Sequence, residues 1–129
     1  MTTSTAQQSI QESKEFTPGQ ILTCSWGYSM TLNNWYVVTR VTNASVWIQE
    51  ICGEVSNDYG TGEGRAMPSM DRTPAMEYDR DGQEITAPVR RFKIRKGDNN
   101  DGQQYIWDTA KQRSIRIWDM SPKYHNTYD

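Results

Sequence analysis

Short runs of alternating apolar and polar residues, separated by turn signals, constrain the fold of this chain more than any other feature. Successive side chains of a strand point to opposite faces, so a period of two predicts a strand with one buried face. No stretch carries the i, i+3, i+4, i+7 apolar spacing of a helix over helical length. The runs that we predict as strands are 20–26, 35–41, 45–51, 89–96, 103–107 and 113–119.

Five or six short strands joined by turns predict an all-β domain. The runs 35–41 and 45–51 are separated by three residues, which predicts a hairpin. We expect a small antiparallel barrel, SH3-like or OB-like, or else a single curved antiparallel sheet. Periodicity does not separate these alternatives.

The chain has 129 residues, the length of one domain. Residues 1–15 are rich in Ser, Thr and Gln and predict a mobile N-terminal tail, followed by a single β domain over 16–129. Segment 53–88 is dominated by turn residues and predicts a long irregular loop, in which the pattern locates no strand. Because ordinary connections rarely exceed ~12–15 residues, we expect this loop to be functional or disordered. Residues 120–129 predict an aromatic-bearing tail.

No apolar run approaches the ~18 residues needed to cross a bilayer, and the N-terminus lacks the cationic and apolar parts of a signal peptide. Cys24 and Cys52 have no CxxC spacing, and two thiols are too few for a disulfide-built scaffold. They are expected to be free thiols, with pairing across a sheet as the alternative. We therefore predict a cytoplasmic protein that makes no contact with membranes.

The residues that enzymes and metal sites need are sparse. His125 is the one histidine and lies near the C-terminus, which excludes a multi-His metal site. Cys24 has no His or Lys beside it in sequence to activate it, and the glycines of 60–64 are not followed by a helical pattern that could bind phosphate. The loops at 79–82 and 97–102 fail the ligand spacing of a calcium site. We predict no catalytic residue, no metal site and no cofactor.

Charge is segregated along the chain. Residues 54–88 contain eight carboxylates against three cations, whereas 89–129 contain nine cations against five carboxylates. The net charge of −2 is far too small for a mimic of DNA. An acidic middle segment therefore precedes a basic C-terminal third.

The basic third is the first candidate binding surface. In the strand predicted at 89–96, alternation places Arg91, Lys93 and Arg95 on one face and Phe92 and Ile94 on the other. Such a cationic stripe suits phosphate or a carboxylate surface. The same predicted strand also contains Arg90 and Lys96. If the last strands pair beside it, the stripe is extended by Lys111, Arg113 and Arg116. The candidates for stacking on bases are Tyr105, Trp107 and Trp118. The alternative is a solvated face that balances the acidic segment.

The acidic segment is the second candidate surface. Met67, Met70 and Met76 lie there beside prolines, and Tyr59 adds an aromatic ring. Flexible thioethers adapt well to protein interfaces. The alternative is that these methionines pack back over the barrel.

Two blocks of the sequence form a recognisable pattern. The first holds Ser25-Trp-Gly-Tyr28, Asn34-Trp-Tyr-Val-Val38 and Ser45-Val-Trp-Ile48, and the second holds Trp118-Asp119, Pro122-Lys123-Tyr124 and Tyr128. This pattern resembles a family of small proteins encoded by phages and mobile elements. The chain departs from it at Met120, where a Gly is usual, and in its long acidic middle. The family has no assigned activity, so the resemblance implies a genomic setting and no catalytic residue.

These observations support two hypotheses. The first is a non-catalytic phage-type accessory protein that binds and inhibits a host protein in the host cytoplasm, for example an anti-CRISPR or anti-restriction factor. The second is a nucleic-acid or signalling-nucleotide binding protein that uses the basic strand 89–96. A homodimer is compatible with both, because a small β domain often has an edge strand free to pair.

Overall fold

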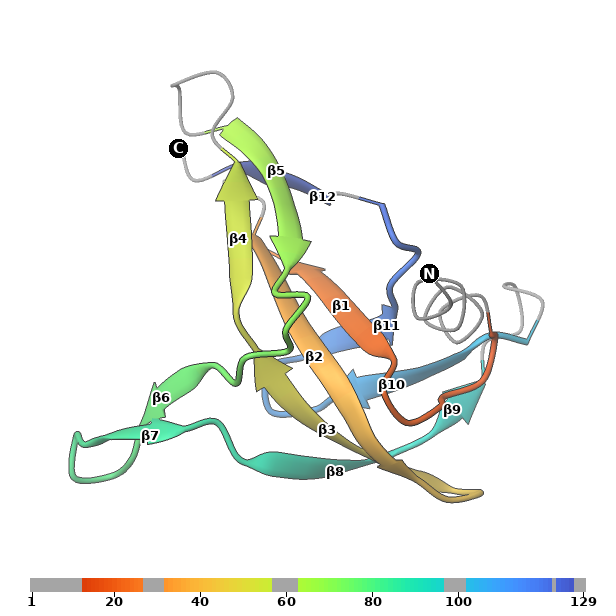
Figure 1. Cartoon of the computed structure of the whole chain (residues 1–129). Helices are drawn as coiled ribbons and strands as arrows, with labels where there is room; N and C mark the ends of the chain where they lie inside the picture. Colours follow the sequence, from red (N-terminus) through yellow and green to blue (C-terminus); the bar gives the residue numbers. More distant parts are fainter. Residues whose placement is uncertain (1–12, 27–31, 57–62, 97–101, 122, 127–129) are drawn as a thin grey trace.

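The computed structural model describes residues 13–26, 32–56, 63–96, 102–121 and 123–126, and it confirms the all-β class (Figure 1). Twelve strands form within these residues, and none of them is in a helix. No helix long and apolar enough to span a membrane is therefore found in the described part of the chain.

A seven-stranded antiparallel sheet curves into a nearly closed barrel. Its strand order is β8-β3-β2-β1-β11-β10-β9, in which two neighbouring pairs are not consecutive in the chain: β3 and β8, which are separated by β4–β7, and β1 and β11, the first and last strands of the sheet. The barrel is thus a meander, whereas an OB fold has Greek-key order. The strands are β1 (Ile21–Trp26), β2 (Leu32–Val41), β3 (Ser45–Ile51), β8 (Val89–Lys93), β9 (Arg95–Lys96), β10 (Gln104–Asp108) and β11 (Arg113–Ile117).

The basic segment 89–96 closes the barrel, because its two halves pair with opposite edges of the sheet. Its first half, β8, pairs with β3, and its second half, β9, pairs with β10. The two halves meet at Ile94, whose amide donates to the carbonyl of Ala44 at 2.9 Å. The single strand predicted here is therefore two strands, and β8 and β10 diverge from this point.

Alternation along the strands fills the barrel interior with apolar side chains, as the sequence predicts. Phe16, at the predicted start of the domain, is buried with this interior cluster. The cluster consists of Phe16, Leu22, Cys24, Tyr36, Val38, Val46, Ile48, Ile106, Ile115 and Ile117, with Val41, Phe92 and Ile94 packed against it.

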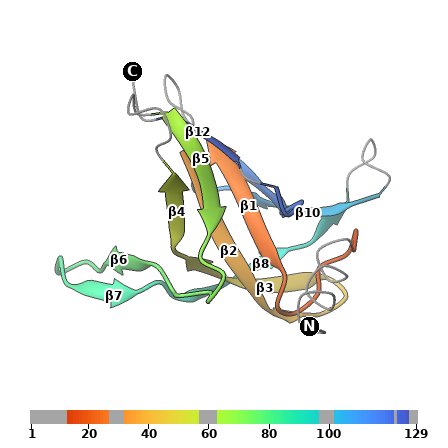
Figure 2. The same cartoon turned by 45° about the horizontal axis from the view of Figure 1, so that its top comes forward.

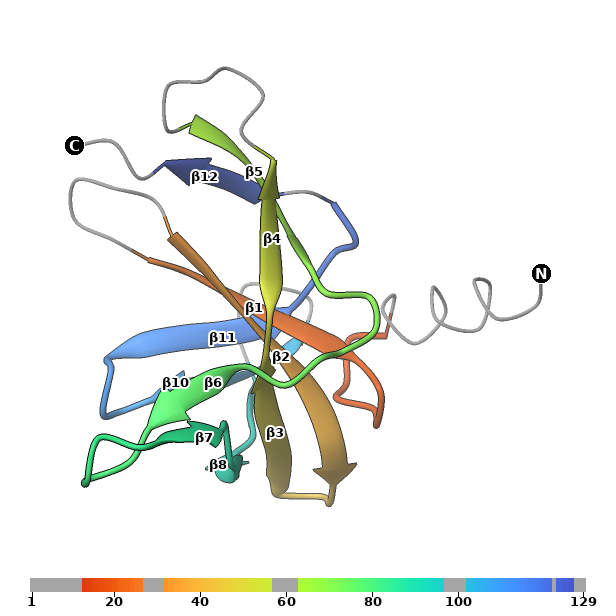
Figure 3. The same cartoon turned by 60° about the vertical axis from the view of Figure 1, so that its left-hand side comes forward.

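The described part of segment 53–88 is not the irregular loop that we predict from the sequence, because it contains β4 (Gly53–Ser56), β5 (Glu63–Pro68), β6 (Met76–Tyr78) and β7 (Glu84–Thr86). The predicted C-terminal tail likewise contains β12 (Lys123–Asn126), and β12, β5 and β4 form a second sheet. Figures 2 and 3 show this sheet as a layer of its own beside the barrel.

A second apolar cluster joins this sheet to the outer face of the barrel. The rings of Trp35 and Trp118 meet edge to face within it, with centroids 5.6 Å apart. Ala66 of β5 is buried in this cluster and Met67 packs against it. Such short strands need few apolar residues, and this explains why their pattern is weak in the sequence.

The remaining strands, β6 and β7, form a two-stranded hairpin that projects from the barrel (Figures 1 and 2). We call residues 76–86 the arm. Backbone hydrogen bonds from Ala75 to Glu50 and from Ala87 to Ala75 hold its base. The Gln49 side-chain amide also donates to the Ala87 carbonyl at 2.8 Å.

Candidate ligand-binding site

A cleft of about 700 Å³ lies where β8 and β10 diverge, and we call it the fork site. Figure 1 shows the two strands separating from the short β9. A volume of this size is within the range of small-molecule pockets. The lining residues are Tyr36, Ile48, Glu50, Pro88, Arg90, Arg91, Phe92, Lys93, Arg95 and 107–111.

Cations from the basic segment form one wall of the fork site. Arg91, Lys93 and Arg95 are exposed, and no described carboxylate lies within ion-pair distance of them. Arg90 differs, because its guanidinium pairs with Glu77 of the arm at 3.0 Å. The alternation predicted from the sequence is confirmed, since Phe92 and Ile94 pack on the interior cluster.

The opposite wall comes from β10 and the turn that follows it. Trp107 is 40% exposed, so its ring is available for stacking. Asp108 accepts a hydrogen bond from the Lys111 amide at 3.2 Å, which shapes the turn and places Lys111 in the lining. The fork site therefore combines an exposed indole with cations that pair with no carboxylate of the described residues.

Polar groups from the inner face of the barrel lie at the base of the fork site. Tyr36 and Glu50 are paired across β2 and β3, and the Asn34 amide donates to Glu50 Oε2 at 3.0 Å. Burial, with the negative charge of Glu50 as a further cause, raises the pKa of Tyr36 far above its ordinary value. Its phenol is therefore neutral and serves as a hydrogen-bond donor or acceptor.

The thiol of Cys24 points into the same end of the barrel but is poorly suited to nucleophilic chemistry. Burial raises its pKa, an effect larger than the opposing influence of Arg113. Nucleophilic cysteines react as thiolates, and this thiol stays protonated at neutral pH. Cys52 is exposed, and both cysteines are free.

The predicted stripe residues separate into two groups. Arg116 lies on the outer face, where its guanidinium carbon is 5.0 Å from the Tyr105 ring centroid. Arg113 instead points into the barrel end, where its guanidinium donates to Asn34 Oδ1 at 3.4 Å. Lys96 is exposed on β9 beside the fork site but is not part of its lining. The stripe therefore continues through Arg116 and not through Arg113.

The prediction that Trp118 stacks on a ligand is wrong, because this side chain is 1% exposed. Its indole N–H donates to the Ser121 carbonyl at 2.7 Å, so its polar edge is satisfied internally. In the acidic segment, Met67 is half-buried, whereas Met70 is exposed. Tyr59 lies outside the described residues.

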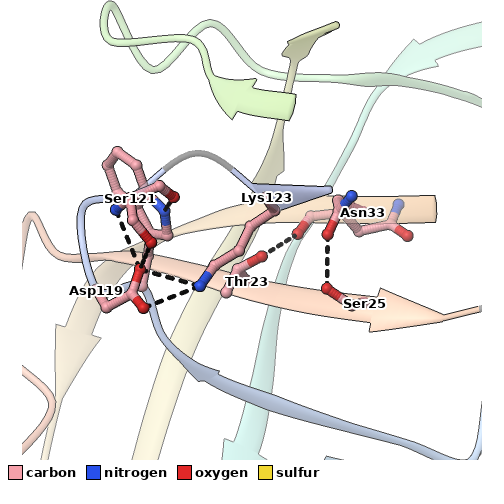
Figure 4. A network of polar contacts seen from close by, with 8 residues as sticks. Thr23, Ser25, Asn33, Asp119, Ser121 and Lys123 are labelled. Carbon is pink, nitrogen blue, oxygen red and sulfur yellow. Dashed lines mark hydrogen bonds and ion pairs between the residues drawn. The ribbon is translucent and has the colours of Figure 1, made fainter. Parts of the chain in front are cut away.

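Asp119, which follows Trp118 in the quoted pattern, organises the turn into β12 (Figure 4). Its Oδ1 accepts hydrogen bonds from the Ser121 amide and hydroxyl and from Lys123 Nζ at 2.9 Å. Burial alone would raise the pKa of Asp119, but these hydrogen bonds outweigh it and lower the pKa to about 2. Met120 has a φ of 70°, the left-handed region that Gly adopts most readily. Trp118, Asp119 and Lys123 of the second block thus have structural roles in this turn, whereas Pro122 and Tyr128 lie outside the described residues.

Tyr36, Glu50 and Asp108 are site residues that the sequence analysis missed. Glu50 continues the alternation of Val46 and Ile48 on the inner face of β3. This alternation is the sequence feature that places Glu50 inside the barrel. It did not indicate that the barrel stays open at this edge.

Comparisons with known proteins return no match, whether to protein-family models, to curated proteins or to solved structures. Among the described residues, no three His, Cys, Asp or Glu side chains group closely enough to hold a metal ion.

Proposed function

We propose that this protein is a non-catalytic binding protein whose fork site takes a nucleoside phosphate, either as a free nucleotide or within a single strand of nucleic acid. The observation that carries the proposal is that an exposed indole and cations without an ion-pair partner among the described residues meet in one cleft. Phosphate groups attract Lys and Arg, while aromatic rings stack on bases of any sequence.

The two faces of the fork site suit the two ends of such a ligand. Arg91, Lys93 and Arg95 lie on the outer side, where phosphates would remain partly solvated. Glu50 and Asp108 lie on the inner side, and carboxylate oxygens accept hydrogen bonds from the amino groups of bases. A ligand with an anionic end and an amino-bearing aromatic end therefore fits the charges of both walls.

The test is binding of a fluorescein-labelled ten-nucleotide DNA of mixed sequence, measured by fluorescence anisotropy, with ATP and GTP as unlabelled competitors. Changing Arg91, Lys93 and Arg95 together to Ala should weaken binding at least tenfold. The matched control changes Arg40, Arg65 and Arg80 to Ala, which alters the net charge equally at positions outside the fork site. Equal losses in both triple variants would show a non-specific charge effect and contradict the proposal.

A second candidate function is the inhibition of a host protein, and the arm is the feature that favours it. Met76, Tyr78 and Ile85 are exposed there, and Tyr78 is 71% exposed. An isolated two-stranded hairpin is marginally stable in water, and a partner that covers these side chains would stabilise it. The resemblance to phage proteins supplies the setting, in which such a partner belongs to a host defence system.

This second function is tested by replacing residues 76–86 with a short Gly-Ser linker, which leaves β4 and β5 in place. Capture of a host protein from nuclease-treated lysate should be lost while the thermal unfolding transition is retained. The control variant Glu84→Gln changes a polar side chain of the arm and keeps its apolar ones. Capture that survives removal of the arm would exclude the arm as the docking surface.

A further inference from the structure

A second pocket lies at the end of the barrel next to the fork site, lined by outer-face residues of β1, β10 and β11 and by Cys24 and Arg113, which face the interior. It has a volume of about 470 Å³ and is formed by β1, β10, β11 and Lys123 of β12. We call it the outer pocket. Its lining residues are Thr23, Cys24, Ser25, Trp107, Gln112, Arg113, Ser114, Arg116 and Lys123.

The composition of the outer pocket favours an anion. Cations and hydroxyl groups contribute to its lining, and no carboxylate among the described residues does so. Lys123 is tied to Asp119, whose carboxylate lies outside the lining, and Figure 4 shows this ammonium group on the side of Thr23. An anion entering here would meet the guanidinium of Arg116, whereas the charge of Lys123 is shared with Asp119 just outside the lining.

The hydroxyl of Ser114 is a second, independent observation at the same place. Its oxygen is buried and has no hydrogen-bond partner among the described residues. Buried polar groups are normally satisfied, so this hydroxyl gains a partner when a small shift of the pocket wall exposes it to a bound group. The neighbouring hydroxyls differ, since Thr23 donates to the Asn34 carbonyl and Ser25 donates to Asn33 Oδ1.

The outer pocket and the fork site share Trp107, which lines both. Cross-strand register links them further, because Arg95 pairs with Tyr105, Tyr105 with Arg116 and Arg116 with Thr23. These outer-face side chains form a row in which the ring of Tyr105 lies between the cations Arg95 and Arg116. It runs from the basic segment at the fork site to the outer pocket.

We infer that the ligand is a single strand of nucleic acid at least two nucleotides long, which crosses Trp107 with one phosphate in the fork site and the next in the outer pocket. This inference rests on the proposed function and names its ligand class. A mononucleotide has one base and one phosphate group, so it occupies one of the two pockets. A strand places phosphates on both sides of a base stacked on Trp107.

The test compares deoxycytidine monophosphate, whose base carries an amino group, followed by NMR shift titration, with five-nucleotide DNA and RNA strands, followed by calorimetry. Arg116→Gln should weaken strand binding at least fivefold and monophosphate binding by clearly less, because only the strand needs both pockets at once. Ser114→Ala should also weaken strand binding, while its melting temperature stays equal to or above that of the wild type, because an unsatisfied hydroxyl is removed. Arg65→Ala is the control, a cation on β5 outside both pockets.

The outcomes distinguish this inference from the proposed function. If wild-type protein binds the monophosphate as tightly as the strands, and Arg116→Gln changes neither, the inference is wrong while the proposed function stands. If changing Arg91, Lys93 and Arg95 to Ala leaves monophosphate and strand affinities intact, the proposed function itself fails. Comparison of the DNA and RNA arms shows which strand is preferred.

Discussion

Gly53→Ala tests how tightly the second sheet is joined to the barrel. A Cβ at Gly53 would lie 2.4 Å from Trp35 Cδ1 and 2.6 Å from its Nε1. Because carbon atoms pack at about 3.5 Å or more, the indole would have to move by about 1 Å. It has little room to do so, since Trp35 is 2% exposed and its ring packs against Trp118.

Overpacking of this kind costs about 1–3 kcal/mol, and we expect about 2 kcal/mol because the ring is held from its other side. For a domain of this size the melting temperature should fall by about 6–12 °C. The assay is thermal and urea unfolding followed by tryptophan fluorescence. In a Trp35→Leu background the same Gly53→Ala change should cost clearly less, since a smaller, flexible side chain can move aside. A cost below about 0.5 kcal/mol in the wild-type background would refute the close packing of β4 on the barrel.

Two further predictions concern local backbone and charge. Gln112 has a φ of 54° in the exposed turn between β10 and β11, a conformation that Gly adopts without strain. Gln112→Gly should therefore raise the free energy of unfolding in urea by up to about 1 kcal/mol. The control is Gln83→Gly, which should give no gain because φ is not positive there. Asp119 has a lowered pKa in the folded state, so its contribution to stability is complete above its unfolded pKa of 3.8 and is lost as pH falls toward about 2. The melting-temperature difference between wild type and Asp119→Asn should therefore be constant from pH 5 to 7 and shrink below pH 4, and a difference independent of pH would contradict this assignment.

The barrel could be predicted from the sequence because each of its strands buries one face. Leu22 and Cys24, or Val46 and Ile48, alternate with polar neighbours in the way that a half-buried strand requires. The second sheet could not be predicted in the same way. Its strands contribute little to the core beyond Ala66 and Met67, and a short strand with Gly and Pro carries almost no periodic signal.

Strand alternation also predicted part of the candidate site, whereas the parts that depend on contacts distant in sequence could not be predicted. The facing of Arg91, Lys93 and Arg95 follows from strand alternation alone, and the structure confirms it. The burial of Trp118 depends on Trp35 and the second sheet, which lie far away in sequence. Likewise, the divergence of β8 from β10 depends on which edges pair, and this is a tertiary property.

The salt dependence of binding to the ten-nucleotide strand tests whether the fork site binds phosphate. Five cations that no described carboxylate pairs with line the two pockets: Arg91, Lys93, Arg95, Lys111 and Arg116. For single strands each neutralised phosphate contributes about −0.7 to the slope of log K against log salt, so one phosphate in each pocket predicts a slope of about −1.4, and five phosphates, one for each cation, set a limit of about −3.5. Changing Arg91, Lys93 and Arg95 to Ala should make the slope shallower by at least about 0.7. A slope near zero for the wild type, or an identical slope for the triple variant, would contradict the assignment of the fork site as a phosphate-binding surface.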